Sequence, residues 1–423
     1  MPAVLPLSPR QERGLLLSLA GVQFTHILDF MVMMPLGPLF IDLFRISDAQ
    51  FGWLVSAYTL AAGACGLLMA PYVDRFERKR LLLVAYAGFT LATLACAVAP
   101  SYAVLMLARV AAGAFGGVIG AMTQTLVGDL IPFERRGRAM GLIMASFSLS
   151  TVAGVPASLW LANRWGWHMP FLAIGGLSLA LWLLAARFVP SFRVPVAQGG
   201  ALSAWAQLRA GLVEPNHWRA FALSMCVVGA GMGIIPYITV FSTANIGITN
   251  EQLPLIYLAG GVATFFTSRL WGALSDNFGK VRVLRGLILA STLPLIILTH
   301  LGPTPLWLYL VVTTAFFVFV SGRMVPTMAL ITGAAQPHLR GTFMTLQGCM
   351  QSVGMGVAAM VGGLLIGRDA QGLLTGYGWS GWLALLLSGL AFWLAGRVHL
   401  ASAAGAAPAK GPKGQKLPAS DHD

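Results

Sequence analysis

The sequence predicts an all-α polytopic membrane protein whose helices fall into two related halves. Of its 423 residues, 57% are hydrophobic and only 10% are charged, and the mean hydropathy is +0.77. A soluble domain carries about 25% charged residues. The apolar residues form continuous runs, whereas the strands of a membrane barrel alternate apolar and polar residues. Helices are therefore expected, because a helix satisfies its own backbone polar groups inside the bilayer.

Twelve apolar runs are long enough to cross a bilayer as helices. They cover residues 14–41, 49–73, 81–99, 103–131, 137–162, 168–190, 218–242, 252–275, 283–301, 305–333, 341–366 and 379–400. The longest connection separates the sixth run from the seventh. We therefore expect a first bundle at 1–190, a linker at 191–217, a second bundle at 218–400 and a disordered tail at 401–423.

The basic residues predict the orientation of the chain. If the N-terminus lies inside, 22 of the 27 Lys and Arg residues fall in inner segments, and three fall in outer loops. This bias follows the positive-inside rule and predicts that both termini are cytoplasmic. The net charge of +13 forms no continuous basic stripe, so no nucleic-acid partner is expected. The remaining two basic residues lie within spans: Arg109 and Arg323.

Asp29 is the only carboxylate predicted at membrane depth, near the middle of the first span. A charge in that position costs several kcal/mol or more, so an intramembrane acid is a functional-site hypothesis. His26 lies three residues earlier on the same helical face. Pro35 and Pro38 would kink or end the helix just beyond. Asp29 would bind a proton in a transporter, or would be a structural residue bonded to a neighbouring helix.

Cysteine and methionine give little support for a metal site or a cofactor. The four cysteines fall within apolar segments without metal-ligand spacing, which is typical of small buried residues. Thioethers suit Cu(I), so a copper transporter stays open as an alternative, although Met more often fills cores or lines adaptable cavities. The methionines behind that alternative are Met31, Met33, Met34, Met140, Met144, Met324 and Met328.

The linker contains Leu202, Trp205, Leu208 and Leu212 at helical spacing. This pattern predicts an amphipathic helix on the inner membrane face. A disordered linker is the alternative.

Two motifs repeat at nearly one offset. Asp74 and Asp276 follow the second and eighth spans and are 202 residues apart. The pairs Arg136-Gly137 and Arg340-Gly341 follow the fourth and tenth spans and are 204 residues apart. The two halves are therefore predicted to be structural duplicates.

At these residues the chain resembles the major facilitator superfamily. Its signature after the second span is Gly-x-Leu-x-Asp-Arg-x-Gly-Arg-Arg/Lys. The first copy here matches at Asp74, Arg75, Arg78 and Lys79 and departs at Ala70, Tyr72 and Glu77. The second copy keeps Gly272, Leu274, Asp276, Gly279 and Lys280. The resemblance covers nearly the whole chain and implies two pseudo-symmetric six-helix bundles, the major facilitator fold.

The family pattern implies a role for the repeated acids. An Asp at the inner end of a helix is poorly placed against that helix's own negative end. By resemblance, Asp74 would face the start of the eleventh span near Gly341, and Asp276 would face the fifth span near Gly137. These contacts would close the inner gate. Plain positive-inside topology is the alternative, but acids contribute little to orientation.

Within the superfamily the chain most resembles the arabinose-efflux-permease-like and drug:proton antiporter groups. The similarity rests on Asp29, on Arg109-x-x-x-Gly113 and on Gly154-Val155-Pro156. Val155 separates the Gly and Pro that are adjacent in the antiporter motif. By resemblance, Arg109 would couple to proton binding. Asp29 is its only available carboxylate, so we expect a direct or water-mediated contact.

Several polar residues within spans are candidates for a substrate cavity. Arg323 has no acidic partner in the sequence, so it would bind an anionic substrate group, bond to carbonyls, or snorkel inward. Gln124, Gln347 and Gln351 would line the cavity or bond between helices. Met33 is a further candidate for the lining.

These features predict a monomeric secondary active transporter of a bacterial inner membrane. Its partners would be a small-molecule substrate, protons and the lipid bilayer. It would export small amphipathic compounds in exchange for protons by alternating access. The alternatives are a transporter of an anionic or sugar-like metabolite that uses Arg323, and a non-transporting sensor. An enzyme is not expected, because no Gly-x-Ser-x-Gly, His-Glu-x-x-His or Walker-type pattern occurs.

Overall fold

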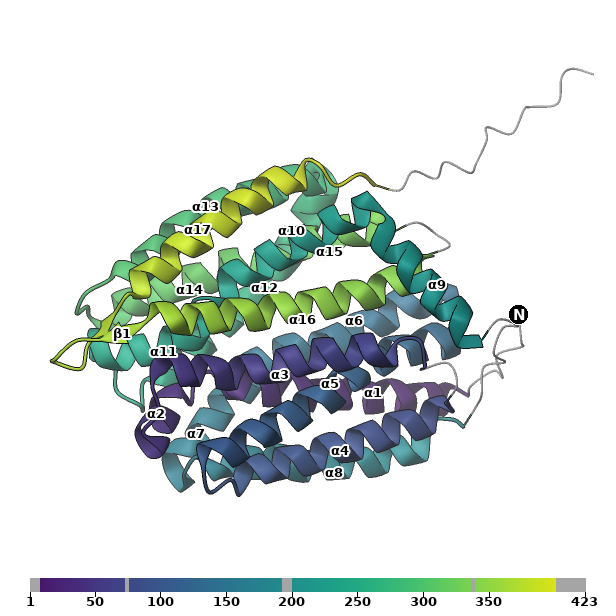
Figure 1. The fold of residues 1–423 in the computed structure, drawn as a ribbon, viewed down its shortest axis with the longest axis horizontal. Coiled ribbons are helices and arrows are strands. Elements are labelled where there is room, and N and C mark those ends of the chain that lie inside the picture. Colours follow the sequence, from purple (N-terminus) through teal and green to yellow (C-terminus); the bar gives the residue numbers. More distant parts are fainter. Residues whose placement is uncertain (1–7, 73–75, 192–199, 336–338, 401–423) are drawn as a thin grey trace, which may run out of the picture.

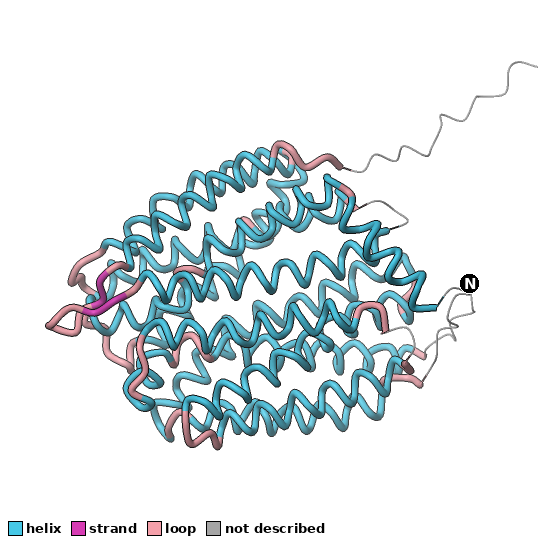
Figure 2. The backbone as a smooth tube through the Cα atoms, viewed as in Figure 1, coloured by secondary structure: helices cyan, strands magenta, loops and turns pink. Residues whose placement is uncertain are grey.

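The computed structural model describes residues 8–72, 76–191, 200–335 and 339–400. Within these ranges, twelve helical segments are long and apolar enough to cross a membrane, which confirms the predicted number. Figures 1 and 2 show them side by side along the long axis of the molecule. A short antiparallel hairpin, β1 (Gly367–Arg368) and β2 (Leu374–Thr375), is the sheet found in this part of the chain.

The N-terminal half contains eight α-helices and one π-helical turn. They are α1 (Pro9–Val32), α2 (Gly37–Phe44), α3 (Asp48–Met69), α4 (Arg78–Ala97), α5 (Tyr102–Leu130), α6 (Phe133–Leu149), η2 (Ser150–Gly154), α7 (Val155–Trp165) and α8 (His168–Phe188). A connecting helix, α9 (Gly200–Val213), follows.

The C-terminal half repeats this plan. Its helices are α10 (Pro215–Met232), η3 (Ile235–Tyr237), α11 (Ile238–Phe241), η4 (Ser242–Ile246), α12 (Leu253–Phe278), α13 (Lys280–His300), α14 (Leu306–Gly322), α15 (Met324–Ala334), α16 (Arg340–Leu365) and α17 (Tyr377–Ala395). Figure 1 shows the N-terminal half in the lower part of the view and the C-terminal half above it. This arrangement is the predicted pair of six-helix bundles.

We call the end of the molecule at which α1 begins the inner end, following the orientation that the Lys and Arg distribution predicts. The opposite end, which carries the β1–β2 hairpin, is the outer end. In Figure 1 the inner end lies to the right and the outer end to the left.

The first membrane segment of each half is broken at an equivalent place. Helix α1 ends at Val32, and a turn containing Pro35 leads into α2. Helix α10 ends at Met232, and a turn leads into η3, which contains Pro236. Proline lacks an N–H and clashes with the preceding turn, so a helix does not continue through it unchanged. The expected effect of Pro35 is thereby confirmed, and the shared break supports the duplication.

Glycines on α5 let it approach α3 closely. A Cβ at Gly113 would meet the carbonyl of Tyr58, and a Cβ at Gly117 would meet the carbonyl of Ala62. Membrane helices associate through such contacts, because apolar side chains gain little by leaving lipid for protein. The close crossing brings the backbone of α5 against α3 next to Arg109.

The linker forms a helix, so the helical alternative holds for residues 200–213. Leu208 is buried in a core cluster of the C-terminal half, whereas Trp205 is exposed. Gly211 lies against Leu346 of α16. Helix α9 therefore packs on the inner end through one face (Figure 1). The predicted tail at 401–423 lies outside the described residues.

The close crossing of α3 and α5 gives a first testable prediction. Gly117→Val places a branched side chain against the Ala62 carbonyl, so the two helices must separate. We expect a loss of about 1–3 kcal/mol, typical of overpacking, seen as a lower melting temperature of the purified protein. Gly120→Val is the matched control, since a Cβ there meets nothing within 4 Å. Equal effects of the two variants would contradict the proposed close contact.

Candidate functional site

The centre of the N-terminal half contains a fully buried ion pair. Asp29 of α1 and Arg109 of α5 have no exposed surface. Nη1 of Arg109 donates to Oδ2 of Asp29 over 2.7 Å and to the Asp29 carbonyl over 3.2 Å. The hydroxyl of Thr93, on α4, donates to Oδ1 over 3.1 Å. The expected direct contact between Asp29 and Arg109 is confirmed, and three helices meet at the carboxylate.

The guanidinium of Arg109 is only partly satisfied by hydrogen bonds. Its Cζ lies 4.5 Å from the centroid of the Tyr58 ring, a cation–π distance. Nε and Nη2 are buried and make no hydrogen bond with the residues that the structure describes. A buried cation with spare donors depends strongly on its one carboxylate, because breaking a buried pair leaves an uncompensated charge.

His26 lies close to the ion pair but packs on a different set of groups. Its ring centroid is 6.0 Å from those of Tyr58 and Phe89, and a Cβ at Gly116 would meet its imidazole. Both ring nitrogens are buried and find no hydrogen-bond partner in the described part of the chain. His26 therefore lies between α1, α3, α4 and α5, and its role in proton coupling stays a prediction.

Helix α1 is tied to the fifth membrane segment beside Asp29. The hydroxyl of Ser146 donates to the Ala20 carbonyl over 2.8 Å, and that of Ser150 donates to the Phe24 carbonyl over 3.2 Å. Gly154 lies against Leu28, the residue before Asp29. The antiporter-like Gly154 thus contacts the helix that carries the acid.

The fifth segment changes from α-helix to a π-helical turn, η2, which ends two residues before Pro156. Proline has no N–H to donate, and π-turns of this kind often mark functional sites. Across from η2, Gly261 of α12 lies against the backbone of Thr151 and Val152. The π-turn is therefore packed between α1 of its own half and α12 of the other half.

Arg323 lies inside the C-terminal half, at the joint between α14 and α15. It is fully buried, and its guanidinium donates to the hydroxyls of Ser291 on α13 and Ser388 on α17, with Nε–Oγ and Nη1–Oγ distances of 2.9 Å. Helices α13 and α17 pack mainly against other helices of the C-terminal half. This orientation points the guanidinium into its own bundle.

The other cavity candidates are scattered. Gln347 on α16 is buried, and its amide atoms make no hydrogen bond to any described residue. Gln351 is half-buried on the same helix, whereas Gln124 on α5 is exposed. Met33 is fully buried in the core cluster at the break after α1. The structure does not bring these four residues into one described pocket.

The inner-gate motif is only partly described. Asp74 and Arg75 lie outside the described residues, and for Arg136 and Gly137 only the backbone, in α6, is described. Arg78 is buried and pairs with Asp129 at the end of α5, with an N–O distance of 3.2 Å. The remaining motif residues lie at least partly exposed at the inner end: Lys79, Asp276, Lys280, Arg340 and Gly341. The two predicted gate contacts stay predictions.

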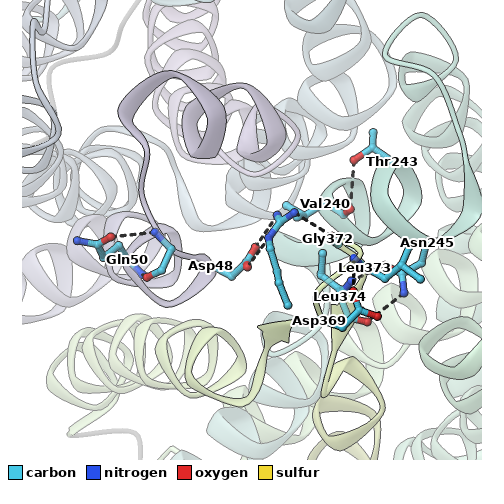
Figure 3. Close-up of polar contacts among 11 residues, drawn as sticks. Asp48, Gln50, Val240, Thr243, Asn245, Asp369, Gly372, Leu373 and Leu374 are labelled. Carbon is cyan, nitrogen blue, oxygen red and sulfur yellow. Dashed lines mark hydrogen bonds and ion pairs between the residues drawn. The ribbon is translucent and has the colours of Figure 1, made fainter.

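At the outer end a second ion pair joins the halves. Asp48 begins α3, and its two carboxylate oxygens accept from Nε and Nη2 of Arg368 over 2.9 and 3.1 Å. Asp48 is 4% exposed, whereas the Arg368 side chain is 36% exposed, so solvent reaches this two-pronged pair from the arginine side. Figure 3 shows Asp48 facing the hairpin.

The hairpin that carries Arg368 is fixed to the C-terminal half. Asn245, in η4, donates to the carbonyl of Leu374 over 3.0 Å and accepts from its N–H over 2.9 Å (Figure 3). The Asp369 carboxylate accepts the N–H groups of Gln371 and Leu373. Arg368 is thereby held at a set position relative to its own half, and its bond to Asp48 links the two halves at the outer end.

The polar partners at both ion pairs were not found by sequence reasoning. Thr93 and Tyr58 are each one of several hydroxyl residues in their predicted spans, and Arg368 lies in a predicted outer loop with no sign of a partner. The sequence feature that indicates such partners is a hydroxyl residue inside a predicted span, because hydroxyl groups form hydrogen bonds between membrane helices.

The sequence profile described as Major Facilitator Superfamily matches residues 19–243 and 220–420. The chain belongs to this superfamily. Among its relatives is YceJ, an uncharacterized MFS-type transporter of Bacillus subtilis, which is 26% identical over 84% of this chain and 90% of its own length. A chloramphenicol efflux pump of Mycobacterium tuberculosis is 25% identical over 78% of this chain and 80% of its own. The family and these relatives are transporters.

The architecture also matches that of solved transporters. A crystal structure of a D-xylose–proton symporter superposes with a TM-score of 0.73, covering 92% of this chain and 97% of that one at 15% sequence identity. At that identity the likeness concerns the fold. It supports the assignment of the twelve helices to the major facilitator architecture of a multi-pass membrane protein.

The buried pair gives a second prediction. Arg109→Gln leaves an unpaired buried carboxylate, and Asp29→Asn leaves an unpaired buried guanidinium, so each lowers stability by about 3–5 kcal/mol. The double variant has no buried charge, and we expect it to lose less than the sum of the two single changes. Melting temperatures of the four purified proteins test this. Additive losses would show that the two groups do not depend on each other.

The outer pair gives a third prediction. Thr239 is fully buried at the outer seam, where its hydroxyl donates to the Met34 carbonyl over 3.1 Å. Thr239→Cys places a thiol at this seam as a reporter of accessibility. When Arg368→Gln is added, the bond to Asp48 is lost. We then expect a membrane-impermeant maleimide, added from outside, to label the Cys several-fold faster. Arg164→Gln removes an equal, exposed charge at the same end and is the control. Unchanged labelling in the Arg368 variant would contradict a closing role.

Proposed function

We propose that this transporter exports small amphipathic compounds in exchange for protons, with Asp29 as the proton carrier. The observation that carries the proposal is the fully buried carboxylate of Asp29, held by Arg109 and Thr93 at the meeting point of three helices. An acid at membrane depth that pairs with a cation is the expected form of a proton-binding site.

Protonation would act by removing the charge that holds Arg109. While Asp29 is ionised, the carboxylate and the guanidinium bind each other at a distance of 2.7 Å. A neutral Asp29 is a much weaker hydrogen-bond acceptor. The guanidinium of Arg109 would then be stabilised by hydrogen bonds to other partners, such as water or backbone carbonyls. The two protonation states then favour different positions of α1 relative to α5, which biases alternating access.

The fifth membrane segment would carry this bias to the other half. Ser146 and Ser150 bond α6 and η2 to α1 on the inner side of Asp29, and Gly154 packs on Leu28. Gly261 of α12 touches the backbone of η2 from the C-terminal half. A shift of α1 would therefore move a segment that already lies at the seam between the halves.

Two observations support the proposal that the exported compounds are amphipathic. The partial antiporter motif at Gly154-Val155-Pro156 lies against α1, and a relative of similar length is a chloramphenicol efflux pump. The metabolite alternative depended on a free Arg323, but this guanidinium bonds to Ser291 and Ser388 inside its own bundle. The placement of Arg323 therefore favours a structural role.

A fourth prediction tests the function in cells that lack their own drug pumps. We expect the wild type to lower the accumulation of chloramphenicol or a lipophilic cationic dye several-fold against an empty vector. Asp29→Asn and a protonophore should each abolish the effect. The variant lacks the proton-binding carboxylate, and the protonophore removes the proton gradient.

The matched control is Asp42→Asn, the same change at an exposed acid of the outer end. Membrane levels of all variants are measured in parallel, so that a failure to fold is separated from a failure to transport. Efflux that persists in Asp29→Asn would remove Asp29 from the mechanism. If cells with the wild type accumulate as much compound as cells with the empty vector, the choice of substrate class is wrong.

A further inference from the structure

A groove at the inner end runs between α4 and α8, away from the ion pair and from the seam between the halves. It is an open groove with a volume of about 310 Å³. The lining consists of Glu77, Lys79, Arg80, Leu83, Val84, Ala87 and Trp182. Trp182 forms one wall, and its indole N–H donates to the carbonyl of Leu83 over 2.9 Å. The groove is therefore built by a fixed aromatic side chain that spans the two helices.

The groove opens toward lipid. Helices α4 and α8 form the lower edge of the molecule in Figure 1. Their main contacts are with other helices of the N-terminal half. Val84 is 59% exposed at its surface. From Lys79 to Ala87 a helix rises by about 12 Å, so the groove extends from the inner boundary well into the hydrocarbon region.

The basic side chains at the mouth of the groove pair with no other group in the part of the chain that the structure describes. The side chains of Lys79 and Arg80 make no hydrogen bond or ion pair with other described residues, although the neighbouring Arg78 is buried against Asp129. The carboxylate of Glu77 also borders the groove, so the mouth carries a net charge of about +1 at neutral pH. Below this mouth the lining is apolar.

We propose that this groove binds an anionic phospholipid of the inner leaflet. The phosphate would lie between Lys79 and Arg80, and one acyl chain would pack along Leu83, Val84 and Trp182. An amphiphile matches a site that is cationic at the membrane boundary and apolar below it. Basic pockets between membrane helices on the cytoplasmic side are typical binding sites for anionic head groups.

A lipid is a better match than a soluble anion for two reasons. The apolar part of the groove faces hydrocarbon, where acyl chains are always present at high concentration. A free phosphate would gain nothing from Leu83, Val84 and Trp182, and it would meet the Glu77 carboxylate without any compensating apolar contact. The occupant is therefore a phosphate ester with at least one long acyl chain.

The fifth prediction concerns selective lipid retention. The full-length protein is reconstituted in nanodiscs that contain equal amounts of phosphatidylglycerol and phosphatidylcholine, and native mass spectrometry then counts the lipids that stay bound. We expect preferential retention of phosphatidylglycerol by the wild type. The double change Lys79→Gln with Arg80→Gln should lower this preference about thirtyfold, the change in affinity that corresponds to about 1 kcal/mol for each of the two basic side chains near an anionic surface.

The C-terminal half supplies a matched control. Lys280 and Arg282 stand at the start of α13, as Lys79 and Arg80 stand at the start of α4, and each pair consists of a half-buried Lys and an exposed Arg. The change Lys280→Gln with Arg282→Gln removes the same charge from the same end. An equal loss of preference in this control would overturn the site, because it would reflect overall charge alone.

Three further measurements test the groove. Exchanging the two residues, Lys79→Arg with Arg80→Lys, preserves charge and should preserve the preference, so a loss of fold is recognised. Trp182→Ala should reduce the retention of phosphatidylglycerol, because it removes a wall of the groove. Inorganic phosphate at millimolar concentration should not displace the lipid. Displacement by phosphate, or equal retention of both lipids by the wild type, would contradict lipid recognition at this groove.

Discussion

The structure depends on one requirement: two opposite charges buried at membrane depth must stay together. An isolated carboxylate or guanidinium inside the protein costs several kcal/mol, and here the cost falls because the two groups meet with good geometry. Asp29 and Arg109 lie on different helices, so this condition fixes how α1 and α5 face each other. Thr93 on α4 and the ring of Tyr58 on α3 complete the surroundings. Four of the helices of the N-terminal half are thereby aligned around one contact.

Small residues make that alignment possible. The Cα atoms of Gly113 and Gly117 lie where any side chain would meet the backbone of α3. Gly116 leaves room for the imidazole of His26, and Gly154 leaves room for Leu28. The glycines thus surround the charged pair on several sides. Close helix packing and charge burial are two aspects of one arrangement, because the pair is dry only when the helices are in contact.

The seam between the halves is held differently. At the outer end, the ion pair of Asp48 and Arg368 and the bond from Thr239 to the Met34 carbonyl cross from one half to the other. The Met34 carbonyl lies in the turn before Pro35, where it also accepts the Gly37 N–H over 3.2 Å. The break after α1 and the helix α11 that follows the break after α10 therefore supply the two groups of one polar contact across the seam. An exposed loop alone would not fix the arginine, and the bonds of Asn245 to Leu374 supply that rigidity.

The sequence by itself determined the number of spans, the duplication, and the positions of Asp29 and Arg109 along them. These properties are encoded residue by residue, since hydrophobicity and charge decide what crosses a bilayer whatever the neighbours are. Only the tertiary structure decided which way each helix faces. It turned Arg323 toward Ser291 and Ser388, and it paired Arg368 with Asp48. The physical reason is that a membrane helix is apolar on all sides, so its periodicity does not mark the buried face, and its rotation is set by packing against other helices.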